Sequence, residues 1–217
     1  MTKLIIFDLD GTLIDSLADL AASANHALRA RGFPGHPLDA YRYFVGNGVV
    51  KLLERALPED RRDRETLARL FEEFTRYYGM HRADLTAPYP GITALLEELK
   101  RRGMLLAVAS NKYHSAADAM TRLYFGDTLF DFVHGHQEDV PTKPHPAIAL
   151  EILSEAGVAP GEAFFVGDSG VDMQTARAAG IRSIGVTWGF RAREELLENG
   201  ADFIIDSPRE LLPLVSC

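Results

Sequence analysis

The sequence contains almost no cysteine and no long apolar run, and both absences narrow the class of protein. Its single cysteine, Cys217, excludes an intrachain disulfide and a cysteine-rich zinc site, and it fits a reducing cytoplasm. No apolar stretch approaches the roughly 20 residues that a membrane-spanning helix needs. The apolar run at residues 4–7 meets Asp8 too early for a signal peptide. We therefore expect a cytoplasmic protein without a membrane partner.

Positive charge is also scarce. The 217 residues include 23 Lys plus Arg against 31 Asp plus Glu, which gives a net charge of −8. This sign argues against nucleic acid as the main partner. The content of 47% hydrophobic and 25% charged residues is that of a folded protein and excludes disorder, collagen and coiled coil. Residues 15–85 carry 11 basic and 11 acidic residues, so the rest of the chain holds the whole acidic excess.

Short apolar runs alternate with stretches of helical periodicity over most of the chain. Runs typical of buried strands lie at 4–7, 105–109, 132–134, 163–166, 183–188 and 202–205. Helical spacing of apolar residues is found at 92–102, 146–156 and 171–179. This alternation predicts an α/β fold, with a Rossmann-like parallel sheet covered by helices on both faces.

Residues 15–85 interrupt this alternation. They show helical patterns at 19–31, 49–57 and 63–78 and no convincing strand. The simplest interpretation is a helical domain at 15–85, inserted into an α/β core formed by 1–14 and 86–217. We expect the connections near Asp15 and at the Pro88-Tyr89-Pro90-Gly91 segment to act as hinges.

A pair of aspartates follows the first predicted strand, in the segment Asp8-Leu9-Asp10-Gly11-Thr12. Residues two apart in an extended chain point the same way, so Asp8 and Asp10 project together and favour a bound cation. Gly11 permits the tight turn that brings backbone close to a phosphate or metal. Taken alone, the segment is at least as well explained by a turn and a helix cap.

Two further polar segments precede predicted helices. Ser110, Asn111 and Lys112 follow a strand, where hydroxyl and backbone N–H groups can bind a phosphate oxygen. Lys143 lies in the segment Thr142-Lys143-Pro144-His145-Pro146, whose prolines stiffen the backbone around the charge. The plainer alternatives are a helix N-cap for Ser110 and a surface position for Lys143.

The fourth polar segment, Gly167-Asp168-Ser169-Gly170-Val171-Asp172, follows a strongly apolar strand. Asp168 ends the strand, and Asp172 lies one helical turn further on, although it is also suited to stabilising a helix N-terminus. All four segments fall at the carboxyl ends of predicted parallel strands, where such sheets bind ligands. Coincidence is therefore a poor explanation for the set.

The four segments in this order resemble the motifs of the haloacid dehalogenase superfamily. Its phosphatases carry Asp-x-Asp-Gly-Thr, then Ser or Thr, then Lys, then Gly-Asp-x-x-x-Asp. Further segments look like the phosphoglycolate phosphatase branch, namely Val45-Gly46-Asn47-Gly48, Pro88-Tyr89-Pro90-Gly91, Ser110-Asn111-Lys112 and Val186-Thr187-Trp188-Gly189-Phe190-Arg191. The resemblance implies that the helical insertion is a cap domain.

The resemblance also implies a role for each motif residue. Asp8 would be the nucleophile that forms an aspartyl-phosphate, and Asp10 the general acid and then base. The Mg²⁺ ligands would be Asp8, Asp10 through its backbone carbonyl, Asp168 and Asp172. The substrate-binding residues would be Gly11, Thr12, Ser110, Asn111 and Lys143. Lys143 would also be catalytic, because its charge offsets charge that develops in the transition state. An aspartate at position 10 favours phosphoryl transfer over carbon–halogen cleavage, because the dehalogenases lack it.

The expected activity is hydrolysis of a small phosphorylated metabolite, with 2-phosphoglycolate as first choice. An inorganic pyrophosphatase, an enzyme like beta-phosphoglucomutase and a non-catalytic binding protein are the alternatives. Lys51 in the insertion is either a contact for a substrate carboxylate or a solvated helix lysine. The loop Gly135-His136-Gln137-Glu138-Asp139 departs from the pattern of many relatives, and we assign it no catalytic role. The sequence leaves the oligomeric state open.

Overall fold

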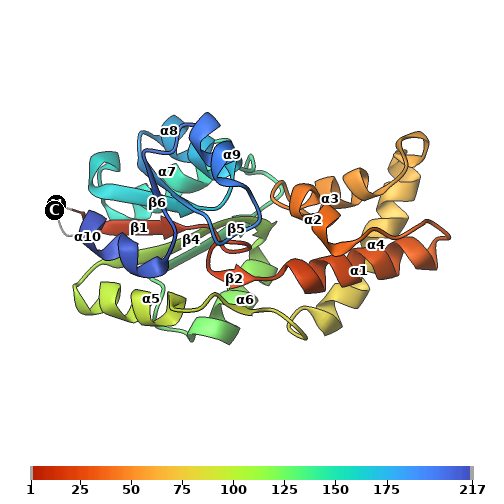
Figure 1. Cartoon of the computed structure of the whole chain (residues 1–217), viewed down its shortest axis with the longest axis horizontal. Coiled ribbons are helices and arrows are strands. Elements are labelled where there is room, and N and C mark those ends of the chain that lie inside the picture. Colours follow the sequence, from red (N-terminus) through yellow and green to blue (C-terminus); the bar gives the residue numbers. More distant parts are fainter. Residues whose placement is uncertain (1, 216–217) are drawn as a thin grey trace. The chain divides into compact units, whose positions relative to one another are not determined.

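A parallel sheet of six strands is the frame of the larger part of the molecule (Figure 1). The computed structural model describes residues 2–215, and Cys217 lies outside them. The strands of the sheet are β1 (Leu4–Phe7), β4 (Leu105–Tyr113), β5 (Phe132–His136), β6 (Ala163–Gly167), β7 (Arg182–Val186) and β8 (Phe203–Ile205). Their spatial order is β5-β4-β1-β6-β7-β8, with parallel neighbours throughout. The predicted Rossmann-like sheet is confirmed.

Helices pack on both faces of this sheet (Figure 1). They are α5 (Ile92–Arg101), α6 (His114–Phe125), α7 (Ala147–Ala156), α8 (Gly170–Ala179), α9 (Arg193–Glu198) and α10 (Leu211–Val215), with short 3-10 turns at Pro160–Glu162 and Pro208–Glu210. Apolar residues of α5 and α6 belong to one buried cluster, and those of α7 and α8 to another. The two clusters lie on opposite sides of the sheet because side chains alternate along each strand.

The strand β1 illustrates this alternation. Ile5 and Phe7 belong to the cluster with α5 and α6, whereas Leu4 and Ile6 belong to the cluster with α7 and α8. Each of these four side chains is at most 1% exposed. An uninterrupted apolar run is therefore what a central strand covered on both faces requires.

The bounds of β4 differ from the prediction. The apolar run ends at Ala109, but the strand continues to Tyr113 and includes the polar residues 110–112. Its pairing with β5 shifts register between Ala109 and Tyr113. Backbone hydrogen bonding can continue through polar residues at the edge of a core, so hydrophobic pattern alone places the end of such a strand too early.

Contacts within the chain separate two compact units. One comprises Asp15–Ala87, and the other the described residues before and after it. The first unit holds α1 (Leu17–Ala30), α2 (Leu38–Phe44), α3 (Val49–Ala56), the 3-10 turn Glu59–Arg61 and α4 (Arg64–His81). The short strands β2 (Ile14–Asp15) and β3 (Ala87–Pro88) pair where the chain passes between units. Among residues 2–215, no helix combines the length and apolar character needed to cross a bilayer.

A buried carboxylate ties the two ends of the helical unit together. Asp19, in the first turn of α1, is 3% exposed. Its Oδ2 accepts hydrogen bonds from the Thr86 backbone N–H at 2.8 Å and the Thr86 hydroxyl at 2.6 Å. The Leu85 N–H also donates to both Asp19 oxygens. The segment that leaves the unit is thus held against the helix that enters it.

The order of the strands determines where a ligand can bind. The strand β4 lies on one side of β1, and β6, which comes later in the chain, lies on the other side. In parallel sheets, such a reversal opens a crevice at the carboxyl ends of the central strands. The corresponding position in this sheet is beyond Phe7, between the ends of β4 and β6.

Candidate active site

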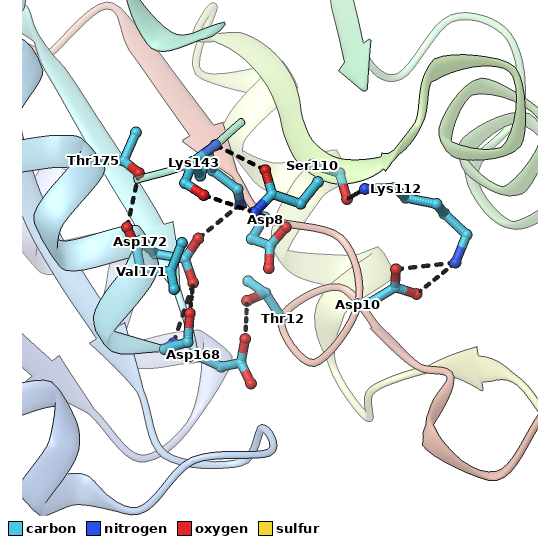
Figure 2. A network of polar contacts seen from close by, with 12 residues as sticks. Asp8, Asp10, Thr12, Ser110, Lys112, Lys143, Asp168, Val171, Asp172 and Thr175 are labelled. Atoms are coloured by element: carbon cyan, nitrogen blue, oxygen red, sulfur yellow. Dashed lines mark hydrogen bonds and ion pairs between the residues drawn. The ribbon is translucent and has the colours of Figure 1, made fainter. Parts of the chain in front are cut away.

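Acidic and basic side chains gather at this carboxyl edge of the sheet. Asp8 directly follows β1, residues 110–112 lie in the last part of β4, and Asp168 directly follows β6. Lys143 comes from the loop before α7, and Asp172 from the first turn of α8. Figure 2 shows these side chains approaching one another from separate elements. The fold therefore brings the four polar segments of the sequence to one place.

The chain turns tightly after Asp8. The Leu9 carbonyl oxygen accepts hydrogen bonds from the backbone N–H groups of residues 12–14. Gly11 has φ +96°, a left-handed conformation that glycine adopts without strain. A Cβ atom at Gly11 would also lie only 2.4 Å from Asp168 Oδ2, so the turn packs directly on that carboxylate.

Lys143 is a buried cation with two carboxylate partners. Its residue is 2% exposed, and its Nζ lies 2.9 Å from Asp8 Oδ1 and 2.7 Å from Asp172 Oδ1. Burial alone would lower the pKa of Lys143, but the charges of Asp172 and Asp8 outweigh it and raise the pKa above its ordinary value. Lys143 therefore stays charged and holds the Asp8 carboxylate in place.

Asp172 connects Lys143 to the start of α8. Its Oδ1 accepts from Lys143, while its Oδ2 accepts from the Ser169 backbone N–H at 3.1 Å and the Ser169 hydroxyl at 2.7 Å. Both oxygens are thus engaged within the protein, which fixes the carboxylate and, through it, Lys143. Ser169 was not among the predicted site residues, although a serine three positions before an acid at a helix start is a known capping pattern.

Asp168 is held equally firmly. Its Oδ2 accepts from the Phe190 backbone N–H at 2.7 Å, and its Oδ1 lies 3.4 Å from the Thr12 hydroxyl, which donates to it. A Cβ atom on Gly189 would lie 2.3 Å from the Asp168 Cβ, so only glycine lets the loop after β7 pass this close. The Thr12 side chain is directed at Asp168, as Figure 2 shows.

The buried carboxylates form a group that could hold a metal ion. Oxygen atoms of Asp8, Asp168 and Asp172 lie within 4.8 Å of one another. An all-oxygen, negatively charged set of donors suits a hard divalent cation such as Mg²⁺. Like charges this close repel each other, and a cation between them would remove that repulsion. The residues present therefore fit a metal site.

The pKa shifts of these acids reflect their burial. Burial raises the pKa of Asp8 to about 7, although Lys143 acts in the opposite direction. Burial, and then the charges of Asp172 and Asp8, raise the pKa of Asp168 well above its ordinary value. The largest cause of both shifts is that the ionised forms lose their hydration. A cation bound among these oxygens would favour the ionised forms again.

The side chain of Asn111 holds the backbone of Lys143. Asn111 Oδ1 accepts from the Lys143 backbone N–H at 2.8 Å, and Asn111 Nδ2 donates to the Lys143 carbonyl oxygen at 3.0 Å. The neighbouring Ser110 is 2% exposed, and its hydroxyl oxygen accepts from the Lys112 N–H at 3.2 Å. The Asn111 contact joins residues 32 positions apart, so no local pattern in the sequence indicates it.

Asp10 lies apart from the other acids and pairs with a residue that was not predicted to act in the site. Its two carboxylate oxygens lie 3.1 and 3.0 Å from Lys112 Nζ. In Figure 2 the Asp10 carboxylate points away from Asp8 and toward this ammonium group. Lys112 follows Ser110 and Asn111 directly, and only its position in that motif could have singled it out.

Lys51, which the sequence leaves as either a substrate contact or a solvated helix lysine, is exposed within its own unit. Its side chain is 51% exposed, and its Nζ lies 2.6 Å from Glu54 Oε2 on the same helix. Such an exposed pair contributes little to stability.

Sequence comparisons place this arrangement among known proteins. The sequence model of the family described as haloacid dehalogenase-like hydrolase matches residues 5–186. The chain is 35% identical over 219 residues to a phosphoglycolate phosphatase of Haemophilus influenzae, covering 98% of both proteins. It is 34% identical over 221 residues to a phosphoglycolate phosphatase of Pseudomonas putida, covering 98% of this chain and 79% of that one.

Solved structures with the same fold agree with these matches. A protein from Lactobacillus delbrueckii subsp. bulgaricus superimposes with a TM-score of 0.93 at 32% identity, over 99% of each chain. CbbY from Rhodobacter sphaeroides, crystallised in complex with phosphate, superimposes with a TM-score of 0.76 at 28% identity, over 97% of this chain and 96% of that one.

Proposed function

The chain belongs to the haloacid dehalogenase-like hydrolase family, and we propose that it hydrolyses 2-phosphoglycolate to glycolate and phosphate with Mg²⁺ as cofactor. The substrate is supported by curated relatives of that activity, which match 98% of this chain. The reaction is supported above all by one feature of the site. Asp8, a buried carboxylate at the end of β1, is held by the buried cation Lys143 beside further carboxylates.

In the proposed first step, an Asp8 oxygen attacks phosphorus, and the bond from phosphorus to the bridging oxygen breaks. The product is a phosphoryl group on Asp8, an acyl phosphate that water can hydrolyse. A carboxylate approaches a phosphate dianion only when positive charge offsets their repulsion. Lys143 supplies such charge at a fixed place, because Asp172 and the Asn111 side chain hold its ammonium and its backbone.

The proton transfers are assigned to Asp10. It would give a proton to the bridging oxygen as the alcohol leaves, and then take one from the water that attacks the phosphoryl group. After that second step the Asp8 carboxylate is free again. Ser110, the backbone of Asn111, and the turn at Gly11 and Thr12 would surround the phosphoryl oxygens.

Mg²⁺ would be held by Asp8, by the Asp10 backbone carbonyl and by Asp168, with Asp172 supporting the site through Lys143 or a water. When bound, the ion would neutralise negative charge on the carboxylates and the phosphoryl oxygens. In this proposal the α/β unit carries the chemistry and the helical unit is the cap. The small phosphorylated substrate and the single cysteine are in keeping with a cytoplasmic enzyme.

The proposal is tested with purified protein and a panel of phosphorylated compounds, measured by release of inorganic phosphate with and without Mg²⁺. The panel contains 2-phosphoglycolate, sugar phosphates and pyrophosphate. We expect 2-phosphoglycolate to have the highest kcat/KM and EDTA to abolish its turnover. A preference for pyrophosphate, or isomerisation of beta-glucose 1-phosphate without phosphate release, would replace the proposal by one of those activities. No turnover of any substrate would contradict it.

A further inference from the structure

Lys112 is a buried cation that the proposed chemistry does not use. Its side chain is 8% exposed, and that of its partner Asp10 is 13% exposed. Burying an ammonium group costs free energy, and a paired carboxylate offsets that cost only when its geometry is good. Lys143 already supplies the charge beside Asp8, so Lys112 is a second lysine at the same edge of the sheet. Lys112 contacts Asp10, whereas Lys143 contacts Asp8 and Asp172.

The contact with Asp10 indicates which part of the substrate Lys112 faces. As the proposed general acid, Asp10 must come within about 3 Å of the bridging oxygen. Lys112 Nζ lies 3.0 and 3.1 Å from the Asp10 oxygens. While both contacts hold, the ammonium lies within about 6 Å of the bridging oxygen, beside the leaving group.

The leaving group of 2-phosphoglycolate carries a carboxylate close to that oxygen. The carboxylate carbon is separated from the bridging oxygen by two covalent bonds, or about 2.5 Å at standard bond lengths. A carboxylate oxygen can therefore contact the ammonium while Asp10 faces the bridging oxygen. Figure 2 shows that this ammonium group already contacts one carboxylate, that of Asp10.

We propose that Lys112 binds the carboxylate of the substrate and makes the enzyme selective for phosphomonoesters with an acid next to the ester carbon. This inference rests on the proposed phosphatase function and adds the residue that distinguishes the substrate from neutral esters. Lys112 shares its charge between Asp10 and the bound carboxylate. The exposed Lys51 is the alternative ligand for the substrate carboxylate, because the sequence also allows it this contact.

The experiment compares 2-phosphoglycolate with 2-hydroxyethyl phosphate, which has the same ester linkage but a hydroxymethyl group in place of the carboxylate. The variant is Lys112→Met, whose side chain is of similar length without the charge. We expect the ratio of kcat/KM for the two substrates to fall about 10- to 100-fold, mainly through a higher KM for 2-phosphoglycolate. This is the range for losing one charge-assisted hydrogen bond. Lys112→Arg should retain most of the preference.

The controls separate this role from the others. Lys3→Met removes an exposed ion pair with Glu162 at the other end of β1, and it should leave the ratio unchanged. If Lys112→Met loses kcat/KM equally on both substrates, Lys112 acts only through Asp10. If the ratio of kcat/KM falls in Lys51→Met and not in Lys112→Met, the helical unit recognises the carboxylate. Either result overturns the inference.

A second neutral variant, Lys112→Gln, and thermal melting of each protein guard against an effect of misfolding. If both neutral variants fold and keep the ratio of the unmodified enzyme, the inference is wrong while the phosphatase function stands. If the unmodified enzyme turns over neither substrate, the proposed function fails, and the inference fails with it.

Discussion

At the scale of single residues, the site depends on interactions between charges, and burial strengthens these interactions. Lys143 is surrounded by Asp8 and Asp172 at hydrogen-bonding distance, and its side chain is 1% exposed. Interactions between charges away from water are stronger than at a surface, but removing one partner leaves the other uncompensated. The same arrangement is thus suited to transition-state stabilisation and sensitive to substitution.

Replacing this lysine should therefore affect both activity and stability. In Lys143→Met, the Asp8 and Asp172 carboxylates lose their shared cation. We expect the free energy of unfolding at pH 7.5 to fall by about 3 kcal/mol in denaturant titrations, as for other broken buried pairs. We also expect kcat to fall at least about 100-fold. An active, equally stable Lys143→Met protein would contradict the role given to the pair.

The raised pKa of Asp8 predicts how stability depends on pH without metal. In the folded protein the pKa is about 7, against an ordinary value of 3.8. The folded state therefore binds this proton more tightly, and its contribution to stability is full below pH 3.8 and lost as the pH rises through 7. Asp8→Asn cannot ionise and should escape this loss.

In EDTA, the stability of Asp8→Asn relative to the unmodified protein should thus increase by about 2 kcal/mol between pH 5 and pH 8. Unfolding free energies from urea titrations at the two pH values measure this difference. If the stability difference between the two proteins is the same at pH 5 and pH 8, the pKa of Asp8 is not raised in the folded protein.

At the scale of elements, loops and strand ends are joined by side chains that contact backbone. The Asn111 side chain in β4 makes two hydrogen bonds to the backbone of Lys143, in the loop before α7. Asp19 in α1 does the same for Leu85 and Thr86 at the end of the helical unit. These contacts give irregular segments a fixed position.

Asn111→Ala tests whether the position of Lys143 matters to catalysis. The substitution removes both hydrogen bonds to the Lys143 backbone but leaves its ammonium group intact. We expect kcat to fall about 10- to 100-fold with a small change in KM, because a misplaced charge stabilises the transition state less well. In Asn111→Asp, which keeps one acceptor for the Lys143 N–H, kcat should fall less than in Asn111→Ala. Unchanged kcat in Asn111→Ala would make the contact purely structural.

Asp19→Ala should destabilise the helical unit. The variant leaves the buried Thr86 hydroxyl and the N–H groups of residues 85 and 86 without their acceptor. The expected loss is about 2 kcal/mol of unfolding free energy, with increased hydrogen exchange at residues 85 and 86. Asp39→Ala, which removes an exposed acid at the start of α2, is the matched control and should have little effect. Equal stability of the two variants would contradict the role of Asp19.

The sequence was sufficient to predict the sheet, because the central strands are short apolar runs bounded by polar residues. It placed Asp8 and Asp168 at strand ends for the same reason. It did not reveal that β4 continues through its polar residues to Tyr113. Nor did it reveal the Lys112–Asp10 pair, whose members lie 102 positions apart. Which of several lysines meets a given carboxylate depends on packing, and periodicity carries no information about it.

At the scale of the whole molecule, the negative net charge can be assigned to one part of the chain. The net charge of −8 belongs entirely to residues outside 15–85. Part of it is the buried group of Asp8, Asp168 and Asp172, where acids are costly without a cation. An acidic protein can thus act on an anionic substrate, because the acids recruit the positive charge that the substrate needs.

Mg²⁺ should therefore stabilise the folded protein as well as support turnover. At 100 times its dissociation constant, a ligand that binds only the folded state adds about 2.7 kcal/mol. We expect the melting temperature to rise by several degrees with Mg²⁺ and to return with EDTA. The rise should be smaller in Asp168→Asn, which loses one charged donor. Equal responses of the two proteins would argue against a metal site at this group.

The central claim is that Asp8 carries the phosphoryl group during hydrolysis of 2-phosphoglycolate. The most direct measurement is phosphate release from 2-phosphoglycolate with Mg²⁺ by the unmodified enzyme and by Asp8→Asn, with folding of both checked by circular dichroism. The account predicts turnover by the former and a loss of at least about a thousandfold in the latter. It also predicts a phosphoryl group on the peptide containing Asp8 after acid quenching. A folded Asp8→Asn protein with undiminished turnover would contradict it.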